Sequence, residues 1–270
     1  MKKKATTLFS ILKTLITNPG KLRLLADREK ECFNHIKKNY PEFSEGLPVI
    51  DFAAACKTQQ ETVVPYTFLG GNSLPTDLLL LNSLAKQSPN CSYFEIGTWR
   101  GESVANVARY AGNCYTLNLS DKSMQEMGLS ENYIKAHRFF SKNLSNVSHL
   151  QGDSMKFDFS PYRGKIDLIF VDGDHHFHQV AGDTRNAFSM LKNENAVIVW
   201  HDYGFQPEEI RYEVLAGILE GCPKDKLRSL YQVSDTKCAI YTSTKFVSRP
   251  MKAYADPGHY FEVSIKEKKV

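Results

Sequence analysis

The feature that most constrains this chain is a glycine-containing turn within residues 94–103, with the sequence FEIGTWRGES. The apolar residues before Gly97 predict a short buried strand, and the small and apolar residues after Gly101 predict a helix. Glycines between a strand and a helix let the backbone bend tightly and let a ligand approach the peptide groups. The first N–H groups of the helix then point toward that ligand. The turn therefore predicts a ligand site at a strand end of an α/β fold.

The spacing of the glycines argues against a dinucleotide site. A dinucleotide fingerprint has three glycines as G-x-G-x-x-G, and this turn lacks the third. Glu95 precedes the first glycine, and a carboxylate suits an amino-bearing or cationic group but repels a pyrophosphate. A nicotinamide-dependent oxidoreductase is therefore disfavoured. Taken alone, the segment also fits an ordinary strand-to-helix turn in another doubly wound protein.

Strands and helices are predicted to alternate from residue 91 onward. Apolar runs predict strands at 91–96, 114–119, 147–151, 166–171 and 196–200, and helical periodicity predicts helices at 102–111, 130–142, 175–191 and 207–220. This alternation is typical of a parallel sheet with helices on both faces. Two further strands, 227–233 and 238–242, are joined by only four residues and must pair antiparallel. We therefore predict a Rossmann-like, doubly wound, mostly parallel sheet of seven strands with an antiparallel last strand.

The chain divides into three parts in this interpretation. Residues 1–75 form a helical and irregular N-terminal extension that serves as a lid or as a contact within a homo-oligomer. Residues 76–245 form the α/β domain, which begins with a helix that opens at Pro75 and runs through Lys86. Residues 246–270 form a C-terminal extension, in which 260–265 reads as an added strand. The aromatic and glycine-rich loop 66–73 is either a wall of the substrate site or a surface connection.

Charge and cysteine content limit the classes of partner. The formal net charge is +4, yet residues 1–30 hold eight basic and two acidic side chains, so the remainder is slightly acidic. The body lacks the basic footprint of a nucleic-acid binder. The apolar run 8–16 is too short to span a bilayer, so no stable membrane insertion is expected, although an amphipathic helix there would suit either an anionic membrane or a protein surface. Six cysteines without a C-x-x-C pair indicate neither zinc nor disulfides, and a cytoplasmic location is expected.

Polar side chains follow each predicted strand of the α/β domain. In an open α/β sheet, ligands bind beyond the carboxyl ends of the strands. The residues at those ends are Glu95, Gly97, Thr98, Trp99, Gly101 and Ser103; Asn118, Leu119, Ser120 and Asp121; Gly152, Asp153 and Ser154; Asp172, Gly173, Asp174, His175 and His176; and His201, Asp202 and Tyr203.

Three of these strand ends resemble a known family. The acid-x-Gly-x-x-x-Gly turn, the Asp172-Gly173-Asp174-His175 ending and the His201-Asp202-Tyr203 ending are similar to motifs of class I S-adenosylmethionine (AdoMet)-dependent methyltransferases. The group that they resemble most acts on small molecules and is similar to methyltransferase family 24. The resemblance covers roughly residues 90–245.

The resemblance implies a set of AdoMet-binding residues. These are Glu95, Gly97, Thr98, Trp99, Gly101, Ser103, Asn118, Asp153, Ser154 and Asp172. Asn118 stands where the family has an acid that accepts hydrogen bonds from the ribose hydroxyls. An amide oxygen can also accept such bonds, and Asp121 lies one turn away, so either residue is a candidate for the ribose. Trp99 either forms a wall of the AdoMet pocket or covers the sheet edge.

The same strand ends suggest catalytic and metal-binding roles. A hydroxyl nucleophile must lose its proton, and a histidine with an ordinary pKa near 6.5 suits a general base. His175 is the first choice, with His176 or His201 as substitutes, and Asp172 completes the predicted catalytic set with His175 and His201. Asp172 and Asp202 offer hard oxygen ligands for Mg²⁺. As alternatives, Asp172 would cap a helix and Asp202 would form a turn.

We therefore expect an AdoMet-dependent methyltransferase that methylates a hydroxyl of a small molecule, such as a sugar or a secondary metabolite. One alternative is a metal-dependent phosphohydrolase, because Asp174-His175-His176 and His201-Asp202 superficially match the signatures of such enzymes. That alternative leaves the glycine turn unexplained and needs more ligands than the sequence offers. Another alternative is a non-catalytic AdoMet-binding protein, which the replacement of the family acid by Asn118 would permit.

Overall fold

The computed structural model describes residues 28–57, 60–71 and 73–269. The start of the predicted helical segment 6–40 and the amphipathic run 8–16 lie outside the described residues. Within them, α2 (Arg28–Asn39) is the first helix, and it packs against α9 (Tyr212–Gly221). Glu29 joins the two helices, because its carboxylate accepts hydrogen bonds from the backbone N–H groups of Tyr212 (2.6 Å) and Glu213 (3.2 Å).

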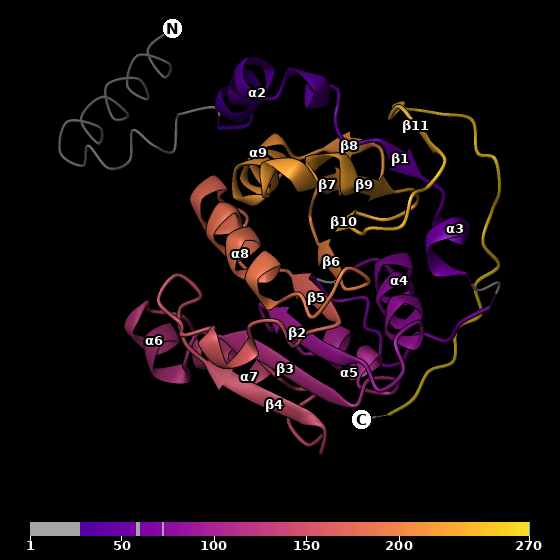
Figure 1. The fold of residues 1–270 in the computed structure, drawn as a ribbon. Coiled ribbons are helices and arrows are strands. Elements are labelled where there is room, and N and C mark those ends of the chain that lie inside the picture. The colour runs from indigo at the N-terminus through magenta and orange to yellow at the C-terminus, as the bar shows by residue number, and fades with distance from the viewer. Residues whose placement is uncertain (1–27, 58–59, 72, 270) are drawn as a thin grey trace, which may run out of the picture.

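The core of the described chain is a twisted sheet of nine strands in the order β11-β1-β9-β10-β6-β5-β2-β3-β4 (Figure 1). Its strands are β1 (Val49–Ile50), β2 (Ser92–Ile96), β3 (Asn113–Asn118), β4 (Val147–Gln151), β5 (Leu168–Val171), β6 (Val197–Trp200), β9 (Leu230–Val233), β10 (Ala239–Tyr241) and β11 (Ser248–Arg249). The five strands β4, β3, β2, β5 and β6 run parallel, and β10 pairs antiparallel with both β6 and β9. The mostly parallel sheet and the antiparallel closing pair are thus confirmed, whereas the sheet has nine strands in place of the predicted seven.

Helices cover both faces of the sheet. One face packs against α8 (Phe177–Met190) and α9, and the other packs against α3 (Phe52–Cys56), α4 (Pro75–Lys86) and α5 (Glu102–Val107). Two short helices, α6 (Asp121–Glu126) and α7 (Glu131–Ala136), follow β3. Short 3-10 helices occur at Pro41–Phe43, Ser160–Tyr162 and Lys224–Ser229. None of the helices in the described ranges has the length and apolar character needed to cross a membrane.

The structure differs from the sequence-based elements in several places. Both extensions add a strand to the sheet: β1 pairs parallel with β9, and β11 pairs antiparallel with β1. The predicted helix 207–220 was too long, because a hairpin of β7 (Gly204–Gln206) and β8 (Glu209–Ile210) precedes α9. The predicted helix 130–142 ends at Ala136, since His137 is extended and Arg138 has a φ of 64°. The predicted strand at 260–265 was wrong, because that segment forms no ladder with the described residues.

The alternation of side chains along the strands determines which residues reach which face. Phe94 and Ile96 of β2 pack in the core beneath α8, whereas Tyr93 packs in the core beneath α4 and α5. Because successive residues of a strand point to opposite faces, Glu95 shares the face of Tyr93. By the same rule Trp200 points toward α8, and the next residue, His201, points toward α4. The α4 face therefore receives polar side chains from two strand ends.

Candidate active site

The glycine turn brings the ends of β2 and β5 into close contact. Gly97 has a φ of 101°, and a Cβ atom there would lie closer than 3.0 Å to the carbonyl oxygen of Asp172. Its N–H donates to the carbonyl of Leu117 at 2.8 Å, which links the turn to β3 as well. Gly101 has a φ of 78°, and a Cβ atom there would meet the side chain of Ser141. Glycine has no Cβ atom, so at these two positions it can adopt a positive φ with the neighbouring atoms this close.

Glu95 lies behind the turn and has no exposed surface. Its carboxylate accepts hydrogen bonds from Tyr93 Oη (2.7 Å) and Thr116 Oγ1 (3.1 Å), and the Ser103 side chain is a further partner. Burial raises the pKa of Glu95 to about 7, although these hydrogen bonds oppose the shift. The carboxylate is thus held by β2, β3 and the start of α5, which fixes the path of the chain through the glycine turn.

The remaining residues of the turn differ in exposure. Thr98 is buried, and its hydroxyl contacts the hydroxyl of Thr116. Trp99 is partly exposed and packs against Tyr133 of α7, with ring centroids 4.6 Å apart. Its indole N–H donates to the carbonyl of Gly70 at 3.4 Å, so the loop segment at Gly70 lies against this side chain. Trp99 therefore joins the glycine turn both to α7 and to the N-terminal extension.

The two candidates for the ribose differ in how freely they can bind. Asp121 is engaged by Arg138, whose Nη2 lies 2.6 and 2.8 Å from its two carboxylate oxygens. Asn118 is half-buried at the end of β3, and its side-chain N–H groups donate to the carbonyl of Leu119 at 3.4 Å and to Met124 Sδ at 3.9 Å. Its side-chain oxygen accepts no hydrogen bond from the described residues. At the end of β4, Asp153 accepts a hydrogen bond from the N–H of Met155 at 3.0 Å, and Ser154 is half-buried.

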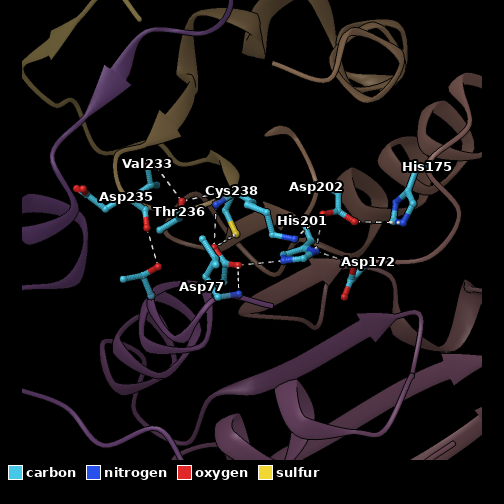
Figure 2. A network of polar contacts seen from close by, with 12 residues as sticks. Asp77, Asp172, His175, His201, Asp202, Val233, Asp235, Thr236 and Cys238 are labelled. Atoms are coloured by element: carbon cyan, nitrogen blue, oxygen red, sulfur yellow. Dashed lines mark hydrogen bonds and ion pairs between the residues drawn. The ribbon is translucent and has the colours of Figure 1, made fainter. Parts of the chain in front are cut away.

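A group of two acids and one histidine forms where β5 and β6 end (Figure 2). His201 Nδ1 lies 3.0 Å from Asp172 Oδ1 and 3.4 Å from Asp202 Oδ1. His201 is buried, whereas the two aspartates are partly exposed. Asp172 does not cap α8, since its N-cap residue is His176. Asp202 has a φ of 50°, a left-handed conformation that aspartate tolerates in turns.

Of the neighbouring histidines, His175 is the one directed toward this group. Its Nε2 lies 3.2 Å from Asp202 Oδ2, and its side chain is about one-third exposed. His176 turns away and pairs with Asp174 instead. His178, in the first turn of α8, is exposed. The structure thus brings together His175, His201, Asp172 and Asp202 from the predicted set, and leaves His176 apart from them.

Positive charge surrounds Asp202. Burial raises its pKa, but His201, Lys237 and His175 hold the pKa well below its ordinary value. Lys237, in the turn between β9 and β10, places Nζ 2.9 Å from Asp202 Oδ1, and its own pKa is raised by that carboxylate against the effect of burial. Burial lowers the pKa of His201, yet Asp172, Asp202 and Asp77 together hold it well above its ordinary value.

The same group offers suitable ligands for a divalent cation. One imidazole nitrogen and two carboxylates have ligand atoms within 4.8 Å of one another. His201 Nδ1 is buried and makes no hydrogen bond of acceptable geometry with the described residues, although it faces both carboxylates. Imidazole and carboxylate ligands together suit first-row divalent ions, and carboxylates suit Mg²⁺. The side chains present therefore fit a metal ion.

Sequence reasoning missed two residues of this site, Asp77 and Lys237. Asp77 accepts a hydrogen bond from His201 Nε2 at 3.1 Å and has no exposed surface. Its only sequence signal is an acid in the first turn of a predicted helix, which is common in any helix. Lys237 lies in a short hairpin turn, where lysine is also ordinary. Neither pattern distinguishes a site residue from a surface residue.

Comparison with known proteins gives matches over part of this chain. Residues 94–203 match the family model described as a methyltransferase domain. The uncharacterized protein R132 of Acanthamoeba polyphaga mimivirus is 29% identical over 132 residues, which cover 46% of this chain and 58% of that protein.

Two solved structures illustrate the likeness at low identity. The O-methyltransferase from Bacillus cereus in complex with SAH is 18% identical, with 56% of this chain and 70% of that chain covered and a TM-score of 0.39. The cofactor-bound Rv0187 from MTB is 18% identical, with 71% and 87% covered and a TM-score of 0.43. The match to a methyltransferase domain therefore concerns residues 94–203 of this chain.

Proposed function

We propose that this protein transfers a methyl group from AdoMet to a hydroxyl oxygen of a small molecule. The observation that carries the proposal is the placement of His175 and Asp202 at the strand ends that adjoin the glycine turn. AdoMet supplies a methyl group that its sulfonium already activates. The protein therefore needs to bind the cofactor, align an acceptor and remove the acceptor's proton.

In this proposal the glycine turn and the ends of β3 and β4 hold the cofactor. Gly97, Trp99, Ser103, Asn118, Asp153, Ser154 and Asp172 are partly exposed around these strand ends, whereas Glu95, Thr98 and Gly101 are buried and support them. Asn118 is the residue that accepts a hydrogen bond from a ribose hydroxyl, because Asp121 is already paired with Arg138. Glu95 acts by fixing the turn through Tyr93, Thr116 and Ser103.

His175 serves as the general base. When its Nε2–H donates to Asp202 Oδ2 at 3.2 Å, Nδ1 is left as an acceptor for the proton of the substrate hydroxyl. Asp202 keeps the imidazole in that orientation and stabilises the positive charge that develops when the proton arrives. His176 is not equivalent, because its partner is Asp174 on the exposed side of the same loop.

Asp172, Asp202 and His201 would hold a divalent cation, for which Mg²⁺ is our first choice. Such an ion supplies charge that lowers the pKa of a bound hydroxyl. The acceptor that such an ion would bind best is a hydroxyl next to a second oxygen, as in a catechol or a vicinal diol, because both oxygens would be available to the cation. A sugar or a secondary metabolite with such a pair is therefore the proposed substrate.

The first test is calorimetric titration with S-adenosylhomocysteine, using the wild type and Asn118→Ala. We expect binding in the micromolar range, weakened about tenfold in the variant because one hydrogen bond to the ligand is lost. Addition of Mn²⁺ to the wild type then reports the cation site. Transfer of tritiated methyl groups to a panel of catechols and vicinal-diol sugars identifies the acceptor. Absence of S-adenosylhomocysteine binding to the wild type would contradict the proposal.

A further inference from the structure

Asp77 is a fully buried carboxylate in the first turn of α4, and it lies between His201 and the turn that joins β9 to β10 (Figure 2). Its Oδ2 accepts hydrogen bonds from the N–H of Leu74 at 2.6 Å and from His201 Nε2 at 3.1 Å. Its Oδ1 accepts from the N–H of Lys237 at 2.9 Å and from the thiol of Cys238 at 3.5 Å. Four donors from three segments therefore converge on one carboxylate.

Capping of α4 accounts for only one of these contacts. An acid at the third position of a helix commonly reaches back to the N–H of the N-cap residue, here Leu74. The other donors are more than 120 residues away in the sequence and belong to the end of β6 and to the 234–238 turn. A buried donor that lacks a hydrogen-bond partner costs free energy of desolvation. Because three such donors share Asp77 as their acceptor, Asp77 is part of the site as well as a helix cap.

The contact with Asp77 determines how the imidazole of His201 is oriented. A carboxylate that already receives three other donors can only accept from Nε2, so Nε2 must carry a proton. The opposite nitrogen, Nδ1, then faces Asp172 and Asp202. Histidines that bind metals almost always donate their other ring N–H to a carboxylate, a carbonyl or a water molecule, and this fixes the ring.

We propose that Asp77 is a positioning residue for the cation site, which orients His201 so that Nδ1 serves as a ligand beside Asp172 and Asp202. The inference rests on the proposed function, because it needs a cation at that site. Asp77 itself contacts neither the cation nor the substrate. Its effect is carried by the ring of His201, which packs edge-on against Phe170 with centroids 5.8 Å apart.

The same carboxylate also sets the position of Lys237. Its Oδ1 holds the backbone N–H of Lys237, while the side chain of Lys237 reaches Asp202 at 2.9 Å. A second link joins α4 to this turn, since Thr76 Oγ1 donates to the carbonyl of Asp235 at 2.6 Å. The first turn of α4, which precedes the glycine turn in the sequence, thus contacts both His201 and Lys237, whose side chains face Asp202.

The test compares Asp77→Asn with Asp167→Asn in the full chain. Asp167 is a matched control, because it is also buried and hydrogen-bonded, to Ser92 N–H and Lys192, but it precedes β5 at the opposite end of that strand. We expect the affinity for Mn²⁺, measured by calorimetry, to fall about 10- to 100-fold in Asp77→Asn and to stay unchanged in Asp167→Asn. The affinity for S-adenosylhomocysteine should stay within about twofold in both variants, since neither residue belongs to the cofactor set.

A measurement on the wild type covers the case in which Asp77→Asn does not fold. Long-range ¹H–¹⁵N correlation spectra of the histidine rings, with the signal of His201 identified from its loss in His201→Gln, report which nitrogen carries the proton. With Mg²⁺ added, a protonated Nε2 together with an unprotonated Nδ1 supports the inference, and an unprotonated Nε2 overturns it. Undiminished Mn²⁺ affinity in a folded Asp77→Asn variant also overturns it. If the wild type fails to bind Mn²⁺, that result contradicts the proposed cation site and, because the inference depends on that site, it contradicts the inference as well.

Discussion

Gly97 touches the backbone of Asp172, so the turn assigned to the cofactor and the strand end assigned to the cation are one piece of structure. The contact joins β2 to β5, since the N–H of Asp172 also donates to the carbonyl of Ile96 at 2.8 Å. A Cβ atom at position 97 would lie closer than 3.0 Å to the carbonyl carbon and oxygen of Asp172. The backbone has no room to yield without moving one of the two strand ends.

Replacement of this glycine should therefore damage both halves of the site. Gly97→Ala adds the clash with Asp172 to the strain of a positive φ, and we expect it to cost about 2 kcal/mol or more of stability. Affinity for S-adenosylhomocysteine and for Mn²⁺ should fall together. Gly70→Ala is the control, since a Cβ atom there meets nothing within 4 Å. Loss of only one of the two affinities in Gly97→Ala would contradict the structural coupling.

The two adjacent histidines provide a test of the general base. We expect His175→Ala to lower kcat for methyl transfer by about 10²- to 10⁴-fold, because the other histidine beside Asp202, His201, is buried and is held by Asp77. His176→Ala removes a ring of the same size that pairs with exposed Asp174, and it should change kcat less than about threefold. The measurement is initial rates at saturating AdoMet with the acceptor found in the panel. Equal losses in both variants would argue against His175.

Lys237 should oppose cation binding in the resting protein. Its Nζ lies 2.9 Å from Asp202 Oδ1, and its side chain is only 15% exposed, so its charge is poorly screened there. We expect Lys237→Gln to raise the affinity for Mn²⁺ by about tenfold, equivalent to about 1.4 kcal/mol. Lys245→Gln, at an exposed position where Nζ donates to Ser229 Oγ at 3.1 Å, is the control. Weaker binding in Lys237→Gln would mean that the lysine supports the site by holding Asp202 in place.

A buried acid outside the catalytic group should make stability depend on pH. Burial raises the pKa of Asp183 from 3.8 to about 6, with the Ser154 side chain opposing the shift. The folded protein therefore holds more protons than the unfolded chain between about pH 4 and pH 6, and stability falls as the pH rises through this window. Asp183→Asn removes the effect, so its advantage over the wild type should grow by up to about 3 kcal/mol between pH 4 and pH 7.5.

Denaturant unfolding of both proteins at the two pH values measures this difference. Asp225→Asn makes the same chemical change at an exposed side chain and should follow the wild type at both pH values. If Asp183→Asn also follows the wild type, the Asp183 carboxyl must titrate in the folded protein as it does in the unfolded chain.

The sequence alone determined the framework on which these residues lie. The sequence located β4 at 147–151 without error and placed the other parallel strands within two residues. The signal is clearest for β5 and β6, because a buried strand is apolar on both faces, whereas β4 lies at the sheet edge and is partly exposed. The helix 75–86 was predicted with its observed bounds, since Pro75 opens it and its leucines repeat at helical spacing. The rule that ligands bind at strand ends then selected Asp172, His175, His201 and Asp202, which the structure brings together.

Only the tertiary structure decided which partners these side chains have. β1 and β11 have two residues each, too few for a periodic signal, and they exist because the sheet edge offers unpaired backbone groups. Asp77 meets His201 across 124 residues of sequence, and Lys237 meets Asp202 across 35. Local sequence patterns record the face on which a side chain lies, but contacts between distant elements follow from how those faces pack. The chemistry of the site depends on those contacts.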